Sequence, residues 1–86
     1  MRINYGDEAA EEIQRVYDDP QQEQLADRLE EILDLLSQDP GDQRLRRHRM
    51  QEPKLWLVKV YGSKREFAFL WESRNGEPWV LWAGDF

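Results

Sequence analysis

The residues best suited to chemistry lie in the segment "RLRRHR", residues 44–49, which holds four arginines and one histidine. A planar guanidinium can hold two oxygens of a phosphate or carboxylate at once. The imidazole of His48 is suited to carrying a proton. Because so many guanidiniums repel one another unless an anion is near, the segment predicts a rim that binds phosphate or a protein partner.

A structural role for the same segment is the alternative. Its arginines could lie in a solvated loop and pair with acidic residues of the preceding helix, such as Glu30, Glu31 and Asp34. His48 is the only histidine, and it could have an incidental role. The sequence alone does not separate these two interpretations.

The formal net charge of −6 hides an uneven distribution along the chain. Residues 1–43 hold 13 Asp and Glu against 3 Lys and Arg, a formal charge of −10, whereas residues 44–86 hold 5 against 9, a formal charge of +4. The net negative charge of the chain disfavours unspecific binding to nucleic acids, which are also negatively charged. A local basic surface can still hold phosphates if the acidic half faces away.

Composition narrows the class of protein further. The 86 residues suffice for one domain with one core, spanning residues 1–86. The absence of cysteine and of any apolar run of membrane length or leader peptide predicts a cytoplasmic protein that does not enter a membrane. We find no Gly-rich phosphate loop, Ser/His/Asp set or metal-ligand spacing, so the sequence predicts neither a metal nor a cofactor.

The first half of the chain reads as helical. After a short predicted strand at residues 2–5, Asp7 is expected to cap a helix that begins at Glu8. Asp19 followed by Pro20 predicts the start of a second, antiparallel helix after a tight turn. The apolar side of this helix is formed by residues spaced three and four apart, namely Leu25, Leu29, Ile32, Leu33 and Leu36.

The second half reads as strands. The segments at residues 55–62, 65–72 and 78–84 are rich in branched and aromatic residues and are separated by "GSK" and "SRNGE", which are typical of hairpin turns. They predict a three-stranded antiparallel meander that packs one face against the helices. The tryptophans are expected either in the core or stacked on RNA bases, with Trp82 the strongest candidate for stacking; the four are Trp56, Trp71, Trp79 and Trp82.

This order of elements, with "LSQDPGDQRLRRHRM" leading into "LWLVKVYGSKREFAFLWE" and then "VLWAG", resembles the RelE/ParE superfamily of toxins from bacterial type II toxin-antitoxin systems. The resemblance implies an α+β fold of RelE type: a short N-terminal strand and an antiparallel helix hairpin packed on the three-stranded meander. It also implies a cognate antitoxin as partner. RelE-type members cleave mRNA on the ribosome, whereas ParE-type members inhibit DNA gyrase.

The resemblance implies a metal-independent site in which the RNA 2′-hydroxyl is the nucleophile. The protein must then move protons and stabilise charge on the phosphate. Carried over by position, the catalytic candidates are Arg46, Arg47, Arg49, Lys59 and Arg65, with His48 as a proton carrier. Candidates for binding RNA or a partner are Arg44, Lys54, Lys64 and Trp82.

Two departures from the family pattern favour other functions. Arg65 is displaced by about one residue from the expected position, which can turn a strand side chain to the opposite face. The C-terminal segment "WAGDF" offers no evident acid for the leaving group. The alternatives are therefore a ParE-like gyrase inhibitor or a catalytically inactive binding module of phage or regulatory origin.

Overall fold

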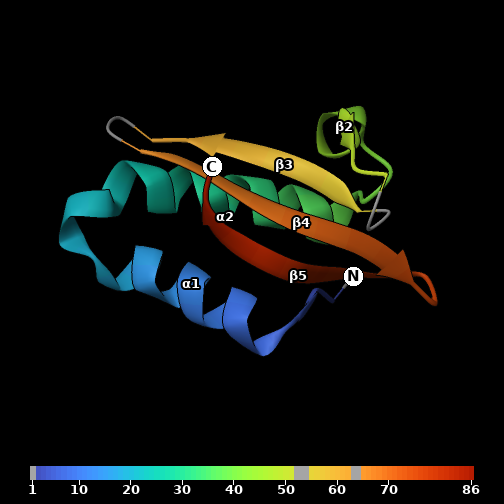
Figure 1. Cartoon of the computed structure of the whole chain (residues 1–86), viewed down its shortest axis with the longest axis horizontal. Helices are drawn as coiled ribbons and strands as arrows, with labels where there is room; N and C mark the ends of the chain where they lie inside the picture. Colours follow the sequence, from blue (N-terminus) through green and yellow to red (C-terminus); the bar gives the residue numbers. More distant parts are fainter. Residues whose placement is uncertain (1, 52–54, 63–64) are drawn as a thin grey trace.

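The computed structural model describes residues 2–51, 55–62 and 65–86. Helices α1 (Asp7–Asp18) and α2 (Glu23–Gln38) follow strand β1 (Asn4–Tyr5) and are joined by the 3₁₀ turn η1 (Pro20–Gln22). A second 3₁₀ turn, η2 (Gln43–Leu45), leads into the strands β2 (His48–Arg49), β3 (Trp56–Tyr61), β4 (Glu66–Arg74) and β5 (Glu77–Asp85). Figure 1 shows the two helices running side by side along the sheet.

The predicted α+β class is confirmed, but the prediction of a three-stranded sheet was wrong. Within the described residues the sheet has five strands in the order β1-β5-β4-β3-β2. The central β3, β4 and β5 form the expected antiparallel meander. β1 adds to β5 in parallel, and the two-residue β2 adds to β3 on the opposite edge.

The start of α1 also differs from the prediction. The helix begins at Asp7, and its cap position is Gly6, which has no side chain to accept a hydrogen bond. The backbone N–H of Gly6 instead donates to the carbonyl of Val80 at 2.8 Å. Pairing of β1 with β5 therefore fixes where α1 begins.

The turn between the helices uses the predicted cap. The Asp19 side chain accepts a hydrogen bond from the backbone N–H of Gln21 at 2.9 Å. Pro20 opens η1 rather than α2 itself, which begins three residues later at Glu23. A fixed proline φ suits this first turn, and its missing N–H costs no hydrogen bond there.

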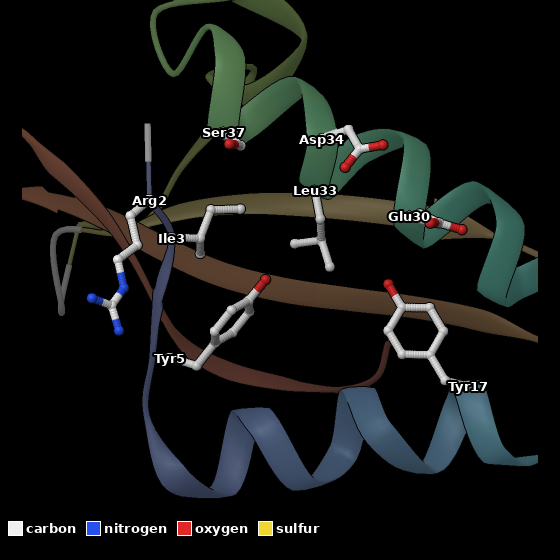
Figure 2. A pocket seen from close by; sticks show the side chains of 8 residues that line it. All are labelled: Arg2, Ile3, Tyr5, Tyr17, Glu30, Leu33, Asp34 and Ser37. Atoms are coloured by element: carbon white, nitrogen blue, oxygen red, sulfur yellow. The ribbon is translucent and has the colours of Figure 1, made fainter.

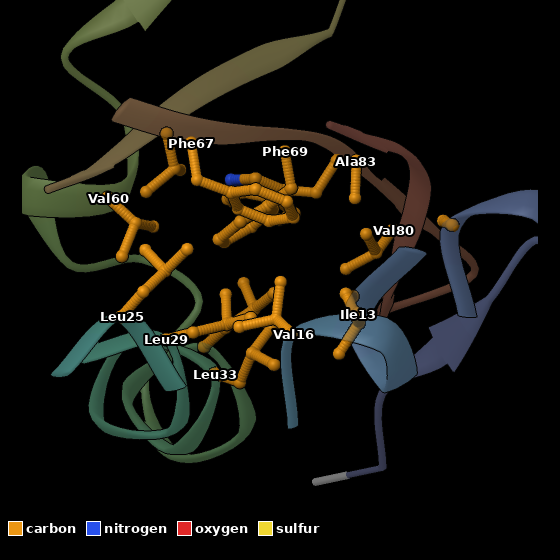
Figure 3. Close-up of a cluster of buried hydrophobic side chains, with 14 of the residues drawn as sticks. Ile13, Val16, Leu25, Leu29, Leu33, Val60, Phe67, Phe69, Val80 and Ala83 are labelled. Carbon is orange, nitrogen blue, oxygen red and sulfur yellow. The ribbon is translucent and has the colours of Figure 1, made fainter. Parts of the chain in front are cut away.

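The core lies between the helices and one face of the sheet (Figure 3). Its centre is built of aromatic residues from β4 and leucines from α2, all fully buried: Phe67, Phe69, Trp71, Leu25, Leu29 and Leu36. On α2 these leucines keep the spacing expected for one helix face. None of the helices in the described ranges is long and apolar enough to cross a membrane.

The opposite face of the sheet carries no helix in the described structure. Val58 and Val60 point into the core, so the alternating Leu57, Lys59 and Tyr61 point outward. On β4, Ala68 belongs to this outer face and is nevertheless fully buried. The outer face is therefore partly covered by its own side chains.

Candidate functional site

The arginine-rich segment is held by its own turn chemistry. Asp42 accepts from the backbone N–H of Arg44 at 2.8 Å and from the guanidinium of the same residue at 2.9 and 3.0 Å. The side-chain and backbone hydrogen bonds from Arg44 lower the pKa of Asp42 to about 2, with a smaller contribution from the charge of Arg47. Arg44, a predicted binding residue, is thus occupied by a local carboxylate.

A buried tryptophan anchors this segment to the core. The indole N–H of Trp71 donates to the carbonyl of Leu45 at 3.1 Å, and both residues are almost fully buried. The guanidinium of Arg46 lies 5.4 Å from the Trp71 ring centroid and 5.5 Å from that of Trp56, and its Nε donates to the carbonyl of Pro40 at 2.9 Å. Arg46 therefore contributes to fixing the loop.

The register of β2 separates the other cationic residues of the segment. Arg49 pairs with Trp56 and places its guanidinium 4.6 Å from that ring centroid. His48 pairs with Leu57 and therefore faces the other side of the sheet. Two of the predicted catalytic arginines, Arg46 and Arg49, thus flank one tryptophan.

A groove between α2 and the edge of β3 gathers Arg47, His48 and Lys59. It has a volume of about 750 Å³. Arg28, Glu31 and Asp34 of α2 and Tyr61 of β3 also line it, together with apolar residues that include Ile32, Leu35 and Leu57. The groove has both charge and an apolar wall, as a binding site requires.

Neither Arg28 nor Tyr61 was predicted for this site, because the sequence does not say which turn of α2 faces the strand edge. Spacing could have suggested Tyr61, which alternates with Lys59 along the same strand.

Lys59 has a second neighbour on the outer face. Its ammonium lies 4.4 Å from the ring centroid of Phe86. Trp82 is 40% exposed, the most exposed of the four tryptophans, whereas Trp71 is fully buried and Trp56 and Trp79 are half-buried. A Cβ added at Gly84 would lie 3.0 Å from the Trp82 ring, so that ring lies along β5 over Gly84. An exposed aromatic ring and a cation thus share the outer face.

The structure places Arg65 away from the groove. Its Nε donates to Asp85, and its guanidinium lies 5.2 Å from the Phe67 ring centroid. Arg65 adjoins the β3–β4 hairpin, whereas His48 pairs at Leu57, about 16 Å away at the usual rise per strand residue. The candidates Lys54 and Lys64 lie outside the described residues.

A second hollow, of about 610 Å³, lies between β1, α1 and α2 (Figure 2). Its lining includes Tyr5 and Tyr17 on one side and Glu30 and Asp34 of α2 on the other. The predicted pairing of Glu30, Glu31 or Asp34 with the arginine segment is absent from the ion pairs of the described residues.

Comparison with known proteins gives no match: no family model, no curated protein and no solved structure is detectably similar to this chain.

Proposed function

We propose that the chain is the toxin of a type II toxin-antitoxin pair and cleaves mRNA without a metal ion in the groove between α2 and β3. The proposal joins the RelE/ParE resemblance to one observation. Arg47 and His48 of the loop and Lys59 of β3 all line one groove. Cationic side chains from separate elements along one groove can hold several phosphates of an RNA backbone.

The chemistry assigned to these residues is transfer of the phosphate within the RNA. The 2′-oxygen loses its proton and attacks the adjacent phosphorus, and the 5′-oxygen leaves and takes up a proton. Arg47 and Lys59 stabilise the negative charge that grows on the phosphate oxygens. His48 and Tyr61 are the groove residues suited to the two proton transfers.

The open edge of β3 supports the proposal that an antitoxin binds to this chain. β2 pairs with β3 only at Trp56 and Leu57, and the N–H of Met50 donates to the carbonyl of Leu55. By alternation, the backbone groups of Lys59 and Tyr61 also point to this edge, where no further strand lies in the described part of the chain. An extended antitoxin segment can pair there and cover Lys59.

Expression in growing bacteria, with mapping of mRNA ends, tests the proposal. We expect growth arrest and new mRNA 5′ ends from the unaltered chain. Both effects should be lost in the variant Arg47→Ala with Lys59→Met and retained in the matched variant Arg15→Ala with Arg74→Ala. Arrest with intact mRNA would refute the ribonuclease, and no arrest at full expression would refute the toxin.

A binding module without ribonuclease activity, such as a gyrase inhibitor or a regulatory protein of RelE-like fold, is the second candidate. It is favoured by the side chains already engaged within the chain: Arg44 with Asp42, Arg46 with Pro40 and Arg65 with Asp85. These contacts leave fewer cations for a transition state. Arrest with intact mRNA and inhibited DNA supercoiling would identify the gyrase inhibitor.

A further inference from the structure

The hollow between β1, α1 and α2 combines aromatic walls with negative charge. Tyr5 rises from β1 and Tyr17 from α1, and in Figure 2 both hydroxyl ends point toward α2. The two side chains are 37% and 39% exposed, so solvent reaches their rings. Ile3 and Leu33 add apolar surface between them.

Two carboxylates stand opposite the tyrosines. Glu30 and Asp34 are four residues apart on α2 and therefore share one helix face. Burial raises the pKa of Tyr17, and the neighbouring Tyr5, Glu30 and Asp34 raise it further. Burial and then Asp34 raise the pKa of Tyr5. The charge of Asp34 thus acts on both phenols, and that of Glu30 acts on Tyr17.

The charge in this hollow is not neutralised by a described ion pair. Neither Glu30 nor Asp34 occurs among the salt bridges of the described residues. Arg2 lines the same hollow, but in Figure 2 its guanidinium points away from both carboxylates. An incoming cation would meet two phenol oxygens, two carboxylates and the faces of two rings.

We propose that this hollow binds a guanidinium group, as carried by an arginine side chain of a partner peptide. A guanidinium is planar, stacks on aromatic rings and donates several hydrogen bonds in one plane, so it can engage rings and carboxylates together. An ammonium is a compact, strongly hydrated charge and uses the two ring faces less well. This site lies on the acidic half of the chain and does not depend on the proposed RNA cleavage.

Titration of the whole chain with N-acetylarginine methylamide, followed by NMR, tests the site. We expect saturable shifts that centre on Tyr5, Tyr17, Leu33 and Asp34. The uncharged citrulline analogue should give no saturable shift, and the lysine analogue should bind at least fivefold more weakly. The same arginine placed inside a Gly-Arg-Gly peptide should bind as well as the free analogue, because only its side chain enters.

Matched variants distinguish binding in this hollow from unspecific attraction of a cation to the negative charge of the whole chain. Glu30→Gln with Asp34→Asn changes two exposed residues and should weaken binding at least tenfold. Glu8→Gln with Glu11→Gln removes the same charge from α1 and should leave binding within twofold. Tyr17→Phe keeps the ring and should weaken binding two- to fivefold.

Equal binding of the citrulline analogue, or equal losses in the two double variants, would overturn the proposal. Equal binding of the lysine analogue would overturn the choice of guanidinium. Absence of any saturable shift up to about 50 mM arginine analogue would also overturn it, since a dissociation constant above that limit leaves less than about 2 kcal/mol of binding free energy.

Discussion

At the scale of single residues, neighbouring arginines have different tasks. Arg46 donates to Pro40 and lies near two tryptophan rings. Within the described residues the Arg47 side chain makes no hydrogen bond or ion pair, and its charge contributes to lowering the pKa of Asp42. The two residues adjoin in the sequence, but only the structure separates an arginine that fixes the loop from one that faces the groove.

This difference predicts that alanine at Arg46 lowers stability, whereas alanine at Arg47 lowers toxicity. Arg46→Ala should lower the free energy of unfolding by about 1 kcal/mol, because it removes a hydrogen bond and contacts with two aromatic rings. Arg47→Ala should change it by less than about 0.5 kcal/mol and should weaken toxicity. Urea unfolding and growth assays of both single variants measure this. A large loss of stability in Arg47→Ala would instead support a structural role for the whole segment.

Asp42 predicts a dependence of stability on pH. Its pKa falls from 3.8 to about 2 in the folded chain, so its ionised form favours folding above pH 4, and this contribution is lost as the pH falls through about 2. Asp42→Asn should therefore be less stable than the unaltered chain at pH 7 and equally stable near pH 2. Thermal unfolding at both pH values checks this, and an unchanged difference would contradict it.

At the scale of elements, the hairpin between β4 and β5 depends on backbone conformation. Asn75 and Gly76 have φ of 52° and 78°, as a two-residue turn between Arg74 and Glu77 requires. The dipeptide "NG" in the sequence predicted this turn from local chemistry alone. The same kind of local signal failed at the start of α1, where Gly6 rather than Asp7 is the cap.

Gly76→Ala should therefore destabilise the chain by about 1 kcal/mol through backbone strain, although nothing lies within 4 Å of the added Cβ. Asn75→Gly should be neutral or slightly stabilising, since glycine accepts the same φ. Urea unfolding of the two variants measures this. Equal stability of Gly76→Ala and the unaltered chain would show that the turn can adopt another conformation.

Trp71 links the central sheet to the loop. Replacing it with phenylalanine leaves the carbonyl of Leu45 without its indole donor and creates a cavity in the core. We expect a loss of about 2–4 kcal/mol in unfolding free energy. The amide signals of residues 44–49 should also shift in NMR spectra. Unchanged loop signals would show that the loop holds its place without Trp71.

At the scale of the whole molecule, the pairing of distant segments escaped prediction. The helices, the meander and the short strand within residues 2–5 follow from local patterns, but the pairing of β1 with β5 and of β2 with β3 is specified by none. The residues predicted to form one site lie apart in the structure, because their positions also depend on strand pairing. Alternation along β2 sends His48 and Arg49 to opposite faces, and Arg65 joins Asp85 at the far end of the sheet.

The central claim is that the groove between α2 and β3 cleaves RNA with Arg47 and Lys59. The most direct test is primer-extension mapping of mRNA cut by the purified chain in a purified translation reaction. The account predicts specific cleavage that a single 2′-deoxy substitution at the cut site abolishes, and at least a hundredfold slower cleavage by Arg47→Ala with Lys59→Met. Intact mRNA, or equal cleavage by that variant and by Arg15→Ala with Arg74→Ala, would contradict it.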